Sequence, residues 1–157
     1  MRILLSSGLV FAGMVAVPYA VSPHQTYREP VPDVRHDPRL ETLRRFFAKS
    51  NCPAERYSEH FLGAADDYSL DWRLLPSISY VESTGGKAAR NNNFFGWDSG
   101  RAQFNSPAAA IYTIGYRLAK SRLYRGKDLD GVLATYNPNE GYARAVKHVM
   151  RQISPAE

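Results

Sequence analysis

Residues 77–87 read SISYVESTGGK, an apolar run that ends on a single glutamate, Glu82, and then breaks into Ser-Thr-Gly-Gly. The run has the character of a helix. Leu75 and Glu82 are seven residues apart, so they differ by only about 20° in direction around a helix. Glu82 is therefore predicted to project from the apolar side of its helix, where a glutamate is rarely found without a partner.

A carboxyl group held against apolar side chains resists ionisation, because its charged form loses hydration. The pKa of such a group rises, so it can stay protonated near neutral pH. A general acid that cleaves a glycosidic bond needs this property. Gly85 and Gly86 follow directly and would let a substrate approach the backbone. The alternative is a solvated or helix-capping glutamate.

Apolar residues recur at helical spacing in six segments. The predicted helices cover residues 39–50, 53–68, 71–82, 107–121, 128–136 and 139–153. Asp71 and Ser106 are expected to cap two of them, and Pro76 should kink its helix or mark its true start. Residues 97–104, WDSGRAQF, have a turn at residues 98–100 between short extended pieces, which predicts a small β-hairpin. The expected fold is mainly α (α+β), with one small hairpin.

The N-terminal segment indicates export. Residues 1–21 carry one early arginine, an apolar stretch and then small residues, which is typical of a signal peptide cleaved after Ala20. Pro18 stands where a small residue is preferred, so an uncleaved signal anchor is the alternative. Either form predicts a periplasmic or extracellular protein. Residues 22–38 contain four prolines and are predicted to be a linker, which leaves residues 39–157 as one domain.

The composition of the chain limits the classes of molecule that we expect it to bind. The chain of 157 residues has a formal net charge of +5 and a pI of about 9.4, which suits nucleic acid, an anionic membrane or an acidic wall polymer. No dense run of Lys or Arg is present, so we expect no nucleic-acid partner. The single cysteine, Cys52, is interpreted as a structural thiol. Scattered histidines without an acid cluster predict no metal and no cofactor, and we expect a monomer.

Two loops carry side chains suited to sugars. Residues 91–98, NNNFFGWD, combine amides, which bind hydroxyl and acetamido groups, with flat rings that cover the apolar face of a sugar. One of the two phenylalanines is expected in the core. Tyr136 and Tyr142 bracket YNPNEGY, and a tyrosine hydroxyl in a cleft can orient water or stabilise developing charge. The alternative for each tyrosine is a half-buried ring with a solvated hydroxyl.

Three segments of the sequence, taken in their order along the chain, resemble a known family. SISYVESTGGK and NNNFFGWDSG, residues 91–100, resemble the Glu-Ser-x-x-Gly and Asn-Asn-x-Phe-Gly blocks of the glucosaminidase domain of bacterial wall hydrolases. These are the mannosyl-glycoprotein endo-β-N-acetylglucosaminidase-like proteins of the lysozyme-like superfamily. ATYNPNEGYARAV, residues 134–146, resembles the closing tyrosine motif of that family. The resemblance spans roughly Asp66 to Ile153.

The resemblance implies a lysozyme-like fold and cleavage of the β-1,4-linked amino-sugar backbone of peptidoglycan. It places the catalytic acid at Glu82 and a late tyrosine at Tyr136 or Tyr142. The expected substrate-binding residues come from the two adjacent blocks. They are Ser83, Asn92, Asn93, Phe95, Gly96, Trp97 and Asp98.

The chain departs from the family in the segment that can supply a second carboxylate. Residues 98–105 are short, and Asp98 is their only acid. We interpret Asp98 as a turn residue, which leaves Glu82 acting with a group of the substrate itself. An acetamido group would give hydrolysis, and a 6-hydroxyl group would give a lytic transglycosylase. The alternatives from other classes are a non-catalytic wall-binding module and a membrane-tethered partner protein that uses the basic surface and the uncleaved anchor.

Overall fold

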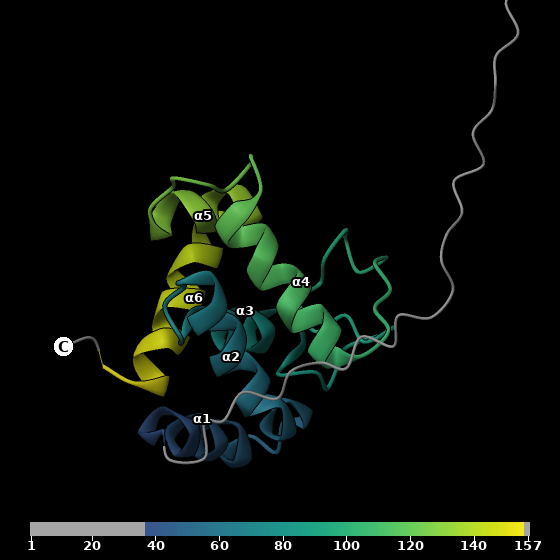
Figure 1. Ribbon diagram of the computed structural model, residues 1–157, viewed down its shortest axis with the longest axis vertical. Helices are drawn as coiled ribbons and strands as arrows, with labels where there is room; N and C mark the ends of the chain where they lie inside the picture. Colours follow the sequence, from purple (N-terminus) through teal and green to yellow (C-terminus); the bar gives the residue numbers. More distant parts are fainter. Residues whose placement is uncertain (1–36, 156–157) are drawn as a thin grey trace, which may run out of the picture.

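The computed structural model describes residues 37–155, which form six α-helices and one 3-10 helix (Figure 1). In chain order they are α1 (Pro38–Lys49), η1 (Pro53–Tyr57), α2 (Ser58–Tyr68), α3 (Leu74–Ser83), α4 (Pro107–Lys120), α5 (Leu129–Tyr136) and α6 (Glu140–Ile153). The mainly helical fold is thus confirmed. The predicted signal segment, residues 1–21, lies outside the described residues, as does most of the predicted linker. Pro38, assigned to that linker, is instead the first residue of α1.

Helix α3 forms the centre of the domain (Figure 1). It contacts α2 on one side and α6 on another, while α4 packs on α2, and α5 packs on α6. Helix α1 closes one end against α2, η1 and α6. Residues 74–79 of α3 are all buried. A short helix enclosed in this way is fixed in place by the helices around it, and so is its last turn, which carries Glu82.

The apolar positions predicted from helical spacing form the core. The largest fully buried side chains come from the five other α-helices, from α3 itself and from the loop after it. They include Leu43, Phe47, Phe61, Leu62, Leu75, Ile78, Phe95, Ile111, Ile114, Leu133 and Val146. Cys52 is buried among them as a free thiol. Within residues 37–155, no helix combines the length and the apolar character that crossing a bilayer requires.

Short polar side chains set the helix starts. Ser106 Oγ accepts from the Ala109 amide at 3.0 Å, with Pro107 at the first position of α4, as expected. The expected cap at Asp71 is wrong in detail, because its carboxylate accepts from the Arg73 amide at 2.9 Å and closes a turn ahead of α3. The helix begins at Leu74, so Pro76 lies in the first turn, where a missing N–H removes no helical hydrogen bond.

The predicted β-hairpin is wrong. No strand occurs among residues 37–155, and residues 97–104 form a series of turns. Asp98, Ser99 and Gly100 have φ angles of 53°, 53° and 81°, so three successive residues are left-handed and the backbone coils instead of extending. The Gly100 amide donates to the Gly96 carbonyl at 2.9 Å within this coil. Asp and Gly accept the left-handed conformation readily, so the same composition that suggests a hairpin turn also permits this coil.

Candidate functional site

A cleft of about 770 Å³ opens over the C-terminal end of α3. Its wall is formed by the end of α3, by the loop that follows, by the end of α4 and its connection to α5, and by the end of α5. The lining residues are Glu82, Gly96, Trp97, Asp98, Ser99, Ala102, Arg117, Leu123, Tyr124, Tyr136 and Asn137. Five of the ten residues predicted from the sequence therefore lie in one wall, and they come from three separate segments: the end of α3, the loop after it and the end of α5.

Glu82 is the ionisable group at the base of this wall. It is half-buried, and burial raises the pKa of its carboxyl above the ordinary value of 4.5. Its position in the last turn of α3 acts in the same direction, because the carbonyl end of a helix disfavours a negative charge. The Tyr142 hydroxyl opposes this shift and lowers the pKa. That hydroxyl is buried and faces the carboxylate, although the two groups fall outside the geometry of a full hydrogen bond.

Gly96 allows the loop to cover the carboxyl. A Cβ atom at this position would collide with Oε2 of Glu82, and the φ angle of +60° is one that glycine adopts without strain. The glycines predicted to admit substrate have another role. A Cβ at Gly85 would lie 2.8 Å from Cβ of Cys52, and a Cβ at Gly86 would meet the ring of Phe94. That pair therefore packs against the core.

Two polar residues predicted to bind substrate hold the loop together instead. The Ser83 hydroxyl is buried; it donates to the Phe94 carbonyl at 2.8 Å and accepts from the Gly86 amide at 2.9 Å. The Asn93 side chain is also buried and bridges the backbone of Trp97, accepting from its amide at 3.0 Å and donating to its carbonyl at 2.9 Å. Neither residue lines the cleft, but Asn93 fixes the position of Trp97.

Two further predicted residues lie away from the cleft. Asn92 donates through its side-chain amide to the Phe104 carbonyl at 2.8 Å, and it borders a separate hollow next to η1. Phe95 is fully buried, and Phe94 nearly so, so both phenylalanines pack in the core where one was expected. Of the loop NNNFFGWD, only Gly96, Trp97 and Asp98 border the cleft.

The two late tyrosines are stacked on each other but differ in what their hydroxyls do. Their ring centroids are 5.8 Å apart with an interplanar angle of 5°. The Tyr136 hydroxyl donates to the Phe95 carbonyl at 2.6 Å, so it is occupied by the loop. The Tyr142 hydroxyl faces Glu82. Burial raises the pKa of both phenols, so each stays a neutral donor.

Sequence reasoning missed the far wall of the cleft. Arg117, Leu123 and Tyr124 come from the end of α4 and the connection to α5. The Arg117 guanidinium lies 5.2 Å from the centroid of the Trp97 ring. Leu123 is 60% exposed, whereas most leucine side chains in folded proteins are largely buried. This exposure is seen in the structure and not in the sequence. No local sequence pattern marks these residues, because only the packing of α4 brings them opposite Glu82.

Asp98 is the second carboxylate of the cleft wall. It accepts from the Arg101 guanidinium at 2.7 Å, and its side chain is 55% exposed. The two acids of the cleft therefore differ in environment, with one sheltered and the other exposed.

In the part of the chain that the structure describes, no group of three or more His, Cys, Asp or Glu side chains is placed to hold a metal ion. Comparison of the chain with protein-family models, with curated proteins and with solved structures gives no match. The chemistry of the site is therefore argued from its own geometry. It combines a sheltered carboxyl, a neutral phenol beside it and an aromatic wall.

The contact between Gly96 and Glu82 leads to a first prediction. Gly96→Ala should displace the carboxyl and let water reach it, so the pKa of Glu82 should fall back toward its ordinary value, which a titration followed by NMR would measure. Gly100→Ala is the matched control, because its φ angle is +81° and a Cβ there meets nothing within 4 Å. Both variants should lose similar stability, about 1–2 kcal/mol for a left-handed alanine. Equal pKa values of Glu82 in the two variants would contradict this role of Gly96.

Proposed function

We propose that this protein is an exported glycoside hydrolase that cleaves β-1,4 bonds of amino-sugar glycans, with peptidoglycan as its substrate. Glu82 is the general acid that protonates the leaving oxygen. The observation that carries the proposal is the half-burial of this carboxyl, with its raised pKa, at the base of a cleft lined by aromatic rings. A carboxyl that keeps its proton and faces a sugar-sized cleft meets the first requirement of glycosidic cleavage.

The aromatic wall supports a sugar as the ligand. Trp97 packs edge-on against Tyr136, with ring centroids 5.6 Å apart, and it lies 6.4 Å from Tyr124. Rings that converge in this way offer flat apolar surfaces to the C–H faces of pyranose rings. In addition, Asn137 presents an amide at the same wall, and amides suit hydroxyl and acetamido groups.

Tyr142 supports the acid. Its buried hydroxyl faces the Glu82 carboxylate and can donate to it once the proton has passed to the leaving group. A donor that strengthens its interaction as negative charge develops stabilises the transition state more than the ground state. We assign Tyr142 this role, whereas Tyr136 maintains the cleft wall through its hydrogen bond to the loop.

The second step is assigned to the substrate. Asp98 is the one other acid among the described residues of the cleft wall, and its hydrogen bond from Arg101 leaves it poorly placed to attack the sugar. The substrate acetamido group then serves as the internal nucleophile, and water opens the resulting intermediate. Attack by the 6-hydroxyl group would instead leave an anhydro end, the product of a lytic transglycosylase. A non-catalytic wall-binding module would use the same cleft without cleavage.

Removal of the acid is the direct test. Glu82→Gln should reduce the release of soluble fragments from purified sacculi by about 10²–10⁴-fold, the usual contribution of a general acid, while glycan binding persists. Glu41→Gln is the control, because Glu41 is an exposed acid on α1 whose contact with Arg45 is long, at 3.5 Å. Binding without release by the parent protein would identify the wall-binding module. Mass spectrometry of the fragment ends separates hydrolysis from transglycosylation.

The raised pKa of Glu82 predicts how activity depends on pH. Only the protonated form is competent, so the rate should fall as the pH rises through the raised pKa. The contribution of Glu82 to the free energy of unfolding also falls as the pH rises. Because the folded pKa exceeds the unfolded one, the contribution of Glu82 is fully present below the unfolded pKa and is lost as the pH rises through the folded pKa. The melting temperature of Glu82→Gln relative to the parent should therefore increase with pH, and a difference independent of pH would contradict the assignment.

Asp98→Asn tests the assignment of the second step. Asparagine adopts left-handed backbone conformations, so the φ angle of 53° at this position should be kept. We expect the variant to retain most of the parent activity in the sacculus assay. A loss of about 10²-fold or more would instead make Asp98 a catalytic carboxylate and would rule out substrate assistance.

A further inference from the structure

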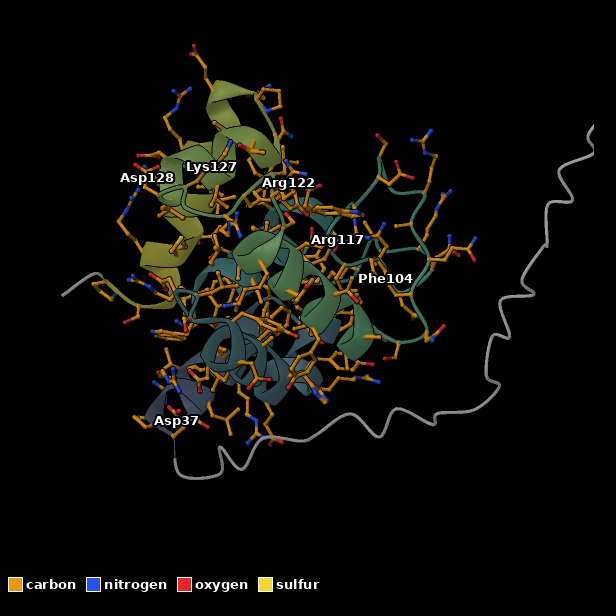
Figure 2. All side chains as sticks on the ribbon, turned by 45° about the horizontal axis from the view of Figure 1, so that its top comes forward. Asp37, Phe104, Arg117, Arg122, Lys127 and Asp128 are labelled. Carbon is orange, nitrogen blue, oxygen red and sulfur yellow. The ribbon has the colours of Figure 1, made fainter. Side chains whose placement is uncertain are left out.

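Arg117 occupies a distinctive place in the cleft. It lies in the last turn of α4, on the side of that helix that faces the loop carrying Phe104 (Figure 2). Its guanidinium carbon is 5.2 Å from the centroid of the Trp97 ring. Among the described residues that line the cleft, Arg117 is the one with a cationic side chain.

The charge of Arg117 is not neutralised by the described part of the protein. No acid in residues 37–155 lies within ion-pair distance of it, whereas Asp98 across the cleft is paired with Arg101. Nor does Arg117 act on Glu82, whose pKa is set by burial and by the Tyr142 hydroxyl. The cleft therefore holds a cation that neither of its acids uses.

The cation–π contact with Trp97 prepares this cation to bind a planar anion. The guanidinium carbon lies over the indole ring, 5.2 Å from its centroid, which favours one placement of the side chain. No hydrogen bond or ion pair with residues 37–155 occupies its N–H groups. Those N–H groups form a rigid fork that matches the two oxygens of a carboxylate. Because fewer side-chain conformations are lost on binding, a pre-ordered arginine binds a carboxylate more tightly than a mobile one.

A chain of ring contacts places this fork near the acid. Trp97 contacts Tyr136, Tyr136 stacks on Tyr142, and the Tyr142 hydroxyl faces Glu82. A group bound at Arg117 thus lies in the same cleft as the cleaved bond and within one continuous aromatic wall.

We propose that Arg117 is a specificity-determining residue that binds a carboxylate of the glycan strand, so that the cleft selects anionic amino-sugar polymers over neutral ones. The inference rests on the proposed function, and it states which class of glycan the cleft prefers. In peptidoglycan, carboxylates are carried by the lactyl group of muramic acid, where no peptide is attached, and by the peptide stem. Both sources present the same planar anion to the fork.

The test measures binding by the whole chain carrying Glu82→Gln, which leaves the glycan intact. Three probes are titrated calorimetrically: an oligomer of N-acetylglucosamine, a glycan strand stripped of peptides by an amidase, and a strand that retains its peptides. Adding Arg117→Gln should weaken binding of a carboxylate-bearing strand by about tenfold or more, the usual effect of losing a charged hydrogen bond. Binding of the neutral oligomer should not change. The strand that is affected identifies the source of the carboxylate.

Arg151→Gln is the matched control. Arg151 is an exposed arginine in the last turn of α6, so its replacement removes the same charge from an equivalent helix end outside the cleft. It should leave all three affinities unchanged. A parent protein that binds the strands through Arg117 but releases no fragments from sacculi would uphold this inference and defeat the proposed hydrolase.

Three results would overturn the inference. Equal weakening of all three probes by Arg117→Gln would show that the residue only supports Trp97. Unchanged binding of all three would show that its charge is not used. A parent protein that binds none of the probes would remove both this inference and the proposed function.

Discussion

The contact between Gly96 and the Glu82 carboxyl is the constraint on which the site depends. Since position 96 has no side chain, the loop after α3 can fold back onto the end of that helix and exclude water from one side of the carboxyl. Loss of hydration then raises the pKa of the acid. The same fold-back places Trp97 beside the acid as a wall of the cleft. The close approach of the loop backbone to Glu82 therefore determines both the raised pKa of this carboxyl and the shape of the cleft.

Ser83, Asn92 and Asn93 hold the loop in its conformation, and none of them lines the cleft. Ser83 and Asn93 are buried and bond to backbone groups of the loop, and Asn92 bonds to Phe104. Buried polar side chains must find partners, and here the partners are backbone groups of the loop. The wall of the cleft includes the aromatic rings of Trp97, Tyr124 and Tyr136, and it comes from segments far apart in the chain.

Much of the fold could be predicted from the sequence because the relevant forces are local. The helical period of apolar residues and a cap such as Ser106 identify helices within a few residues. The half-burial of Glu82 follows from its register with Leu75 on one helix. The coil at residues 98–100 could not be predicted, because residues that favour a hairpin turn also tolerate consecutive left-handed conformations.

The rest of the site depends on tertiary packing. Arg117 and Tyr124 carry no local pattern that marks them as cleft residues, and only the path of α4 sets them opposite Glu82. Likewise, the sequence gives two similar tyrosines at the end of the chain. Which hydroxyl faces the acid is decided by the hydrogen bond that Tyr136 makes to the loop. Differences of this kind are set by contacts between residues far apart in the chain. No periodicity in the sequence indicates them.

The hydrogen bond from Tyr136 to Phe95 joins segments that are made at different times, since synthesis proceeds from the N-terminus. A nascent chain that has reached the loop but not yet α5 and α6 carries Glu82 without the rings that shelter it. Its carboxyl is then hydrated and ionised like any surface acid. The raised pKa of Glu82 is therefore acquired only when the C-terminal helices dock.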